Sequence, residues 1–430
     1  MLKRKAESAL LAWRDRPGRK PLLIRGVRQC GKTHLLRNYA KAVFQNVAYV
    51  NLENEPAARA DFMAGLNPSH IVTSIEARTG QRIVPGKTLI VIDEVQVCEE
   101  ALTSLKYFCE DAPQYHVAAA GSLLGVALNH DSWSFPVGKT ETMDMVPLDF
   151  EEYLWARERE GLAEAIRVSF DSMTPLAPSL HDEAFELFRE YLVVGGMPEA
   201  VQTFVSTGSI VDVAEKHRII LDGYSADTNK YASSELSAKT RSCFDSIPAQ
   251  LAKENRKFQY KVVRRGGNAS MFGDALDWLA LSGTVRKCTR VGQIESPLEA
   301  FADIPNFKIY LCDTGLLVSK SGAQRADILN GLGSTFMGAL AENSVAQALW
   351  ANGYELHYWT RENRAEIDFV VERQGCLSAV EVKWGENTRA RSLAALRGSR
   401  SVDRLVRVSA KPFGNAGGML SVPLYATHCL

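Results

Sequence analysis

Apolar positions divide the chain into a strand-rich first third, a helical middle and a mixed last part. Four short apolar runs stand out early, at residues 21–26, 45–53, 88–93 and 116–122. The third run, TLIVID, is continuous and β-rich, as in strands that a parallel sheet buries on both faces. Because helical stretches alternate with these runs, the pattern predicts a doubly wound α/β domain with helices on both faces of a parallel sheet.

After residue 150 the pattern becomes that of amphipathic helices, FEEYLWARERE and DEAFELFREYLVV, and the second ends at Gly195-Gly196 before Pro198. Between residues 241 and 320, helical segments precede two strand-like runs, TVRKCTRV and FKIYLCD, which fits a winged-helix module. Strand-like runs return near YELHYWT, EIDFVVE and LSAVEVKW. We therefore predict an α/β core over 1–155, a helical lid or linker over 156–240, a winged-helix-like module over 241–320 and a second α/β domain over 325–430.

Composition narrows the class of protein. With 46% hydrophobic and 23% charged residues, the chain is typical of soluble globular proteins, not of disordered or coiled-coil ones. Its 50 basic residues balance 50 acidic ones, so nucleic-acid binding would have to come from local patches. The eight cysteines lack zinc-ligand spacing, and no run has the character of a signal peptide or a spanning helix. We expect a cytoplasmic protein with reduced thiols and no membrane association.

The segment GVRQCGKT matches the phosphate-loop pattern G-x-x-x-x-G-K-[ST], and it lies between a predicted strand and a predicted helix. Backbone N–H groups of such a loop, and the helix that follows it, point at the phosphates of a nucleotide. Lys32 would reach the β- and γ-phosphates, and the Thr33 hydroxyl would bind Mg²⁺. ATP and Mg²⁺ are thus the expected cofactors, and the expected nucleotide-binding residues are Gly26, Val27, Arg28, Gln29, Cys30, Gly31, Lys32 and Thr33.

Polar residues follow two of the predicted strands. Asp93 ends TLIVID and is placed to hold Mg²⁺, while Glu94 is the natural residue to polarise the attacking water. Ser122 follows the strand near His116 and would contact the γ-phosphate or the water. The alternatives are a solvated turn for the carboxylate pair and a simple turn for Gly121-Ser122.

A series of motifs in a fixed order makes the chain resemble a known group. The series is GVRQCGKT, LIVIDEVQ, AAGSLLG, VPLDFEEYL, YLVVGGMPEA, KIYLCDTGLL and AEIDFVV with AVEVKW. That group is the AAA-like P-loop ATPases of bacteria and archaea with a C-terminal domain of unknown function. The resemblance covers most of the chain and implies an ATPase core over 1–155. One departure is Gly138-Lys139, where relatives carry Gly-Arg; lysine lacks the planar fork suited to phosphate oxygens, and a loop lysine is the plainer interpretation.

The last part of the chain holds a second group of charged residues. Alternation along the strands puts Glu366 and Asp368 on one face of EIDFVVE, and Glu381 and Lys383 on one face of AVEVKW. A hairpin would bring Asp368, Glu381 and Lys383 together, and Glu342 on a preceding helix would add a fourth polar group.

This pattern resembles the PD-(D/E)XK nuclease core, and it implies a restriction-endonuclease-like domain over 325–430. By that resemblance Asp368 and Glu381 would bind the metal, Lys383 would be the catalytic lysine and Glu342 the acid on the helix. Two alternatives stay open: charged decoration of an edge strand, or a nuclease fold that no longer cuts.

Two basic clusters suit a phosphate backbone, although a solvated helix face would also explain the first. The first comprises Arg389, Arg391, Arg397, Arg400, Arg404, Arg407 and Lys411, and the second comprises Arg256, Lys257, Lys261, Arg264 and Arg265. Trp359, beside Tyr358, is expected in the core and not as a base-stacking platform.

The sequence thus predicts a Mg²⁺-dependent ATPase that binds nucleic acid, DNA in the first instance, through its C-terminal half, with or without nuclease activity. It also allows a homo-oligomer. The alternative is a nucleotide-dependent regulatory switch that binds nucleic acid or a protein without cutting.

Overall fold

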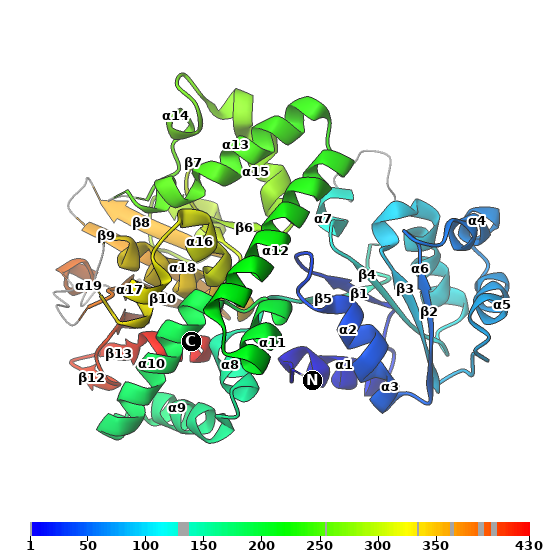
Figure 1. The fold of residues 1–430 in the computed structure, drawn as a ribbon, viewed down its shortest axis with the longest axis horizontal. Helices are drawn as coiled ribbons and strands as arrows, with labels where there is room; N and C mark the ends of the chain where they lie inside the picture. The colour runs from blue at the N-terminus through cyan, green and yellow to red at the C-terminus, as the bar shows by residue number, and fades with distance from the viewer. Residues whose placement is uncertain are drawn as a thin grey trace. The chain divides into compact units, whose positions relative to one another are not determined.

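The computed structural model describes residues 2–127, 137–253, 256–332, 335–361, 365–385, 391–396 and 402–430. The chain folds into two compact units, one of residues 3–146 with 281–283 and one of residues 147–280 with 284–430. Figure 1 shows the course of the chain through both.

The first unit is built on a five-stranded sheet of order β2-β3-β4-β1-β5 in which all neighbours are parallel. Four of its strands coincide with the predicted apolar runs: β1 (Leu22–Arg25), β2 (Asn46–Asn51), β3 (Thr88–Asp93) and β4 (His116–Gly121). The sequence did not reveal the fifth, β5 (Glu141–Asp144), whose side chains alternate between half-buried and exposed.

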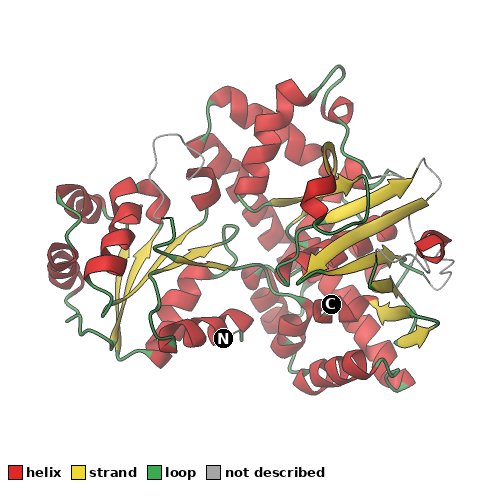
Figure 2. Ribbon diagram, turned by 180° about the vertical axis from the view of Figure 1, so that it is seen from behind, coloured by secondary structure: helices red, strands yellow, loops and turns green. Residues whose placement is uncertain are grey.

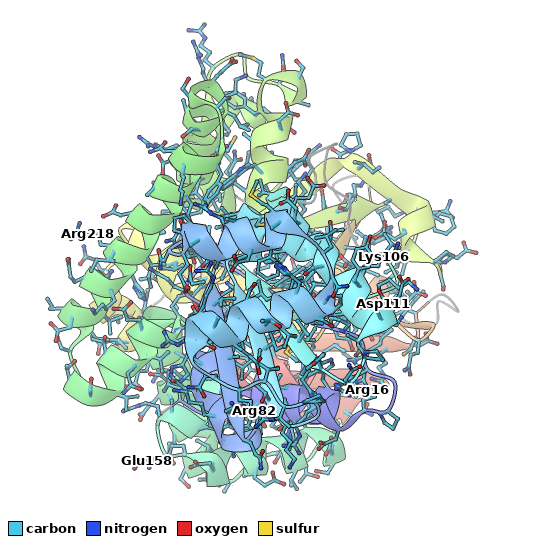
Figure 3. The ribbon with its side chains drawn as sticks, turned by 90° about the vertical axis from the view of Figure 1, so that its right-hand side faces the viewer. Arg16, Arg82, Lys106, Asp111, Glu158 and Arg218 are labelled. Atoms are coloured by element: carbon cyan, nitrogen blue, oxygen red, sulfur yellow. The ribbon has the colours of Figure 1, made fainter. Side chains whose placement is uncertain are left out.

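Helices cover both faces of this sheet, as predicted. Apolar side chains of β2, β3 and β4 pack with α4 (Pro56–Ala64), α5 (Pro68–Thr79) and α6 (Glu99–Asp111) in one core that includes Phe62, Ile75 and Leu105. On the other face, Trp13 of α1 (Lys5–Asp15) and Phe44, just after α3 (Ala40–Val43), pack edge-on against the ring of His116. Every residue of β3 and β4 is buried, which explains their continuous apolar runs. Charged side chains such as Lys106 and Asp111 point outward from α6 (Figure 3).

The second unit begins with a long helical stretch and then combines helices with strands. Its helices are α8 (Phe150–Ala156), α9 (Glu160–Ser172), α10 (Pro178–Val194), α11 (Pro198–Thr207), α12 (Ile210–Tyr231), α13 (Ser234–Leu251), α14 (Tyr260–Val263), α15 (Ala269–Leu281), α16 (Thr314–Ser321), α17 (Arg325–Leu329), α18 (Thr335–Ala351) and α19 (Arg391–Leu396). In the described parts of the chain, no helix combines the length and apolar character that crossing a membrane requires.

One mixed sheet organises the second unit. Its eight strands have the order β12-β13-β11-β10-β9-β8-β6-β7. The strands are drawn in yellow in Figure 2. They are β6 (Val285–Val291), β7 (Ala302–Leu311), β8 (His357–Arg361), β9 (Ala365–Arg373), β10 (Cys376–Val382), β11 (Arg404–Ser409), β12 (Gly414–Ala416) and β13 (Met419–Pro423). The two strands predicted for the winged-helix segment, β6 and β7, pair antiparallel, and β6 also runs parallel beside β8. The segment predicted as a winged-helix-like module and the segment predicted as a second α/β domain therefore contribute strands to the same sheet.

Two of the sequence motifs, YLVVGGMPEA and KIYLCDTGLL, contact each other in the second unit. Asp313, in KIYLCDTGLL, is fully buried and accepts hydrogen bonds from the N–H groups of Gly196 (2.5 Å) and Leu316 (2.9 Å). A Cβ on Gly195 would overlap the Asp313 carboxylate, and one on Gly315 would press on the backbone of Val194. The glycines of YLVVGGMPEA thus allow α10 and α16 to approach closely, which is a packing role.

Candidate functional site

The phosphate loop of the first unit joins β1 to α2 (Lys32–His34), in the strand–loop–helix context that the motif requires. Gly26 has φ 155°, and a Cβ there would overlap the carbonyl oxygen of Met145. Gly31 has φ 103° and caps α2. Both positions therefore need glycine, because a side chain would change the path of the loop.

Lys32 is buried inside this loop. Its ammonium donates to the carbonyl oxygens of Gly26 (2.8 Å) and Val27 (3.0 Å), so the charge lies at the centre of the turn. A cation held there is available to the phosphates of a nucleotide that lies against the loop.

The carboxyl end of β3 brings together the other expected residues of the nucleotide site. The Thr33 hydroxyl donates to Oδ2 of Asp93 at 2.9 Å, and the Tyr49 hydroxyl donates to the same oxygen at 2.7 Å. Arg37 stacks over the Tyr49 ring, 4.6 Å from its centre. Tyr49, which no sequence motif indicated, lies on β2 next to β3 and fixes the orientation of the Asp93 carboxylate.

Glu94 follows Asp93 in a left-handed conformation, with φ 53°. Its Oε2 accepts a hydrogen bond of 2.6 Å from the amide of Gln96, another residue that the sequence analysis missed. Burial raises the pKa of Glu94, and the negative charge of Asp93 adds to this, whereas Gln96 and Lys32 oppose it. The glutamate is therefore enclosed, oriented and a better proton acceptor than an exposed one.

Ser122 lies directly after β4, between the ends of β1 and β3 in the sheet order, and is buried. Lys139, the residue that departs from the family pattern, forms an exposed ion pair with Glu110, with 2.8 Å between Nζ and Oε1.

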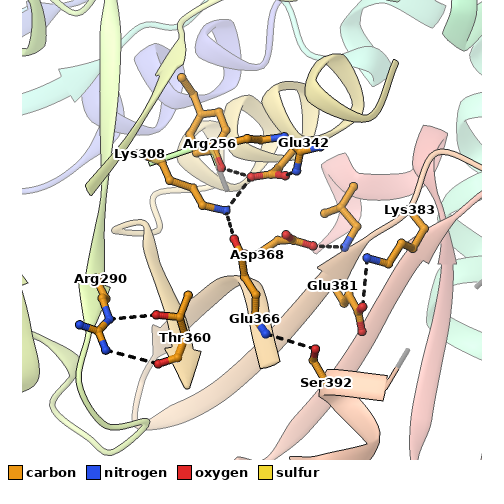
Figure 4. A network of polar contacts seen from close by, with 12 residues as sticks. Arg256, Arg290, Lys308, Glu342, Thr360, Glu366, Asp368, Glu381, Lys383 and Ser392 are labelled. Carbon is orange, nitrogen blue, oxygen red and sulfur yellow. Dashed lines mark hydrogen bonds and ion pairs between the residues drawn. The ribbon is translucent and has the colours of Figure 1, made fainter. Parts of the chain in front are cut away.

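In the second unit, Asp368 on β9 and Glu381 on β10 lie beside each other, since the paired residues Phe369 and Val380 immediately precede them in the ladder. Oδ2 of Asp368 accepts the N–H of Val382 at 2.7 Å, and Oε1 of Glu381 pairs with Lys383 at 3.1 Å (Figure 4). The other oxygen of Glu381, Oε2, is buried and has no hydrogen-bond partner among the described residues. Burial raises the pKa of Glu381, Lys383 opposes this, and the charge of Asp368 adds to it.

Glu342, the acid expected from the helix, is engaged differently from the expectation. It accepts from Lys308 (3.0 Å), from the Tyr310 hydroxyl and from Arg256. Lys308 also pairs with Glu366 at 2.6 Å, so one fully buried ammonium joins α18, β7 and β9 (Figure 4). A lone lysine in a strand carries no signal of burial, so the sequence could not reveal Lys308.

Two further expectations concern the metal site at Asp368 and Glu381 and the two basic clusters. Among the described residues, no three His, Cys, Asp or Glu side chains gather closely enough to hold a metal ion. In the first basic cluster, Arg389, Arg397 and Arg400 and the side chain of Arg391 lie outside the described residues, while Arg404 and Arg407 lie on β11. In the second, Lys261, Arg264 and Arg265 are exposed, but Arg256 is committed to Glu342.

Comparison with protein families assigns the first unit. Residues 18–154 match the model of a family described as "AAA domain", and residues 185–327 and 337–418 match two families described as domains of unknown function. With the geometry of the loop and of Asp93, this match makes the first unit an AAA-type P-loop ATPase domain. No curated protein matches the chain.

Solved structures with a similar course of the chain include a Walker-type ATPase of Pyrococcus abyssi, with 13% identity over 74% of this chain and 96% of that one and a TM-score of 0.43. Others are the ORC2 protein of Aeropyrum pernix (14%, 76% and 92%, TM-score 0.34) and the RuvB Holliday junction branch migration motor of Thermotoga maritima (15%, 65% and 87%, TM-score 0.31). Likenesses this distant do not bear on the activity of this chain.

Proposed function

We propose that this ATPase is Mg²⁺-dependent and that it couples nucleotide hydrolysis to nucleic-acid binding by the second unit. The observation that carries Mg²⁺-dependent hydrolysis is the hydrogen bond from Thr33 to Asp93, because it joins the hydroxyl and the carboxylate that together suit Mg²⁺. The bound ion would offset the negative charge of the phosphates. Lys32 and the loop amides bind the phosphates, Glu94 orients and polarises the attacking water, and Ser122 contacts the γ-phosphate.

Exposed cations support nucleic-acid binding by the second unit. Lys261, Arg264 and Arg265 lie on or next to α14, and Arg404 is exposed on β11. A surface of this kind attracts phosphates without reading sequence, and its affinity falls as salt rises. Together with α13, α15 and the β6–β7 pair, α14 keeps the order of helices and strands that suggested a winged helix, and we assign nucleic-acid docking to this segment.

A second candidate activity, metal-dependent phosphodiester cleavage, is favoured by the unpartnered Oε2 of Glu381. A buried carboxylate oxygen without a donor costs free energy, and a cation shared with Asp368 would remove that cost. The expected nuclease features, a strand–turn–strand pair after a helix, accompany it as α18, β9 and β10. Asp368 and Glu381 would hold the ion, and Lys383 would orient the attacking water or stabilise charge beside it.

The non-cutting alternative is favoured by Lys308. Its ammonium and the guanidinium of Arg256 already neutralise Glu342, so the acid expected from the helix is not available to a metal ion. In that case the second unit binds nucleic acid or a partner and leaves it intact.

The test measures ATP turnover and cleavage together. Phosphate release should require Mg²⁺ and rise when single-stranded DNA, duplex DNA or RNA is added at low salt. Arg264→Glu with Arg265→Glu should remove the rise and leave the basal rate unchanged. If none of the nucleic acids binds or alters the rate, the coupling is wrong.

Cleavage of linear, nicked and single-stranded DNA and of RNA is followed with Mg²⁺ or Mn²⁺, with and without ATP. Asp368→Ala should lower metal affinity, and Lys383→Ala should spare the metal but impair cleavage. A folded preparation that binds these substrates and cuts none of them would decide for the non-cutting alternative.

A further inference from the structure

A pocket opens beside the candidate metal centre, where β6 and β8 end. Its volume is about 410 Å³, within the range of small-molecule sites, and it is open to solvent on one side. The side chains that shape it are Arg290, Ile294, Trp359, Thr360, Arg361 and Leu396.

Trp359 and Leu396 form the apolar wall of the pocket. Trp359 and Leu396 are only partly buried, and both pack against a core cluster that contains Ile367 and Leu393. One part of the indole is thus fixed by the core while another part faces the pocket. Trp359 was expected in the core, and its position at the pocket wall corrects that expectation in part. An aromatic ring held in this way is a suitable surface for stacking a planar ligand.

The polar wall contains two arginines, Arg290 and Arg361, and only the first is paired with other described residues. Arg290 is fully engaged, since it donates to Asp303 (2.9 Å) and to the hydroxyl of Thr360 (3.0 Å). Arg361 is exposed, and its guanidinium makes no hydrogen bond or ion pair within the described parts of the chain. The pocket therefore offers an aromatic surface packed on the core, hydrogen-bonding groups at its edge and a positive charge that no described residue pairs with.

The pocket also has a defined place relative to the candidate metal centre. Thr360 is paired with Glu366 across β8 and β9, and Asp368 lies two residues further along β9 (Figure 4). From β8 to Glu381 on β10 there are two steps of the sheet, which is about 10 Å. A strand that ran past Asp368 and Glu381 would bring a neighbouring nucleotide to the pocket.

We infer that the pocket binds one unpaired nucleotide of a single-stranded nucleic acid, with its base stacked on Trp359 and its phosphate at Arg361. The inference rests on the proposed nucleic-acid binding and adds the class of substrate, because an unpaired base can be splayed out and stacked on a side chain, whereas a base in a duplex is stacked on its neighbours. Stacking on an aromatic ring tolerates every base, so the pocket recognises unpaired strands without strong sequence preference.

Binding of a labelled single-stranded oligonucleotide is measured by fluorescence anisotropy, with EDTA present so that no cleavage occurs. Trp359→Leu keeps an apolar side chain against the core and should weaken binding by about 5- to 150-fold, the usual effect of losing one stacked base. Arg361→Ala should weaken binding and flatten its salt dependence. Arg373→Ala, at the far end of β9, is the matched control and should bind like the wild type. Circular dichroism establishes that each variant is folded.

An oligonucleotide with abasic residues separates stacking from a change in folding. The wild type should lose affinity for it, whereas Trp359→Leu should bind it as weakly as the normal strand. If Trp359→Leu and Arg361→Ala bind the normal strand as the wild type does, the pocket assignment is wrong while the proposed function stands. If the wild type binds duplex DNA but no single strand, the pocket assignment alone is wrong, and if it binds no nucleic acid, both are wrong. Competition by AMP is measured in Lys32→Ala protein, so that binding at the phosphate loop does not contribute. If AMP displaces the labelled strand at the concentrations at which the strand itself binds, the pocket is a free-nucleotide site and the assignment to a strand is overturned.

Discussion

Replacing Lys308 by methionine tests whether the buried ion network holds the second unit together. The side chain of Lys308 is 0% exposed and that of Glu342 is 1% exposed, whereas Glu366 is 34% exposed. Removing one partner of a buried ion pair costs about 3–5 kcal/mol, because the remaining charge stays buried without compensation.

The magnitude expected here follows from what remains around each carboxylate. Glu342 keeps Arg256 and Tyr310, and water reaches Glu366, so the loss should lie at the lower end, near 3 kcal/mol. For a unit of about 280 residues, that lowers the melting temperature by about 5 °C. Lys308→Met with Glu342→Gln removes both charges and should recover part of the loss.

Differential scanning calorimetry is the assay, since the two units need not unfold together. Because the expected nucleotide site lies in the first unit, added ATP should raise the melting temperature of that unit, and the transition that ATP does not shift is assigned to the second. Lys261→Met, an exposed lysine of α14, is the control and should change stability by no more than about 0.5 kcal/mol. If Lys308→Met melts within about 2 °C of the wild type, the network contributes little and the reasoning is refuted.

The nucleotide site yields two further predictions. Because burial raises the pKa of Glu94 and only its ionised form can accept a proton, ATP turnover should fall on the acid side as the pH drops through that raised pKa. Gln96→Leu removes a hydrogen bond that lowers this pKa and should move the acid limb of the rate profile to higher pH; an unmoved limb contradicts the assignment. Gly26→Ala should weaken ATP binding by about 5- to 150-fold in a fluorescence titration, since the new Cβ meets the Met145 carbonyl and forces the loop to strain. Gly161→Ala, which meets open space, is its control, and equal affinity of the two variants would show that the loop tolerates the methyl group.

The sequence predicted those parts of the fold that depend on local pattern. The runs that became β1 to β4 are apolar because helices bury both faces of the sheet, and a phosphate loop is recognisable from eight consecutive residues. β5 escaped notice because ETMD is a half-exposed edge strand paired on one side only. β12 is three residues long, too short for a periodic pattern.

What the sequence could not supply is the pairing of distant segments. β6 runs beside β8 across about 70 intervening residues, and no local pattern in either strand indicates that neighbour. The burial of Lys308 was unpredictable for the same reason, because the carboxylates that pair with it come from distant segments, α18 and β9. The position of Asp368 beside Glu381 was predictable because a short turn joins β9 and β10, so the antiparallel pairing of the two strands brings these residues together.

ATP hydrolysis at the sheet edge where the phosphate loop meets the end of β3 can be measured with three proteins: wild type, Lys32→Ala and Glu94→Gln. ATP binding and phosphate release are followed on the same preparation of each. Wild-type protein should bind ATP with Mg²⁺ and hydrolyse it slowly. Lys32→Ala should lose binding, because the cation inside the loop is gone. Glu94→Gln should keep the wild-type affinity and lose turnover by about 100-fold or more, since the amide cannot accept a proton from water. Turnover by Glu94→Gln at the wild-type rate would contradict the account.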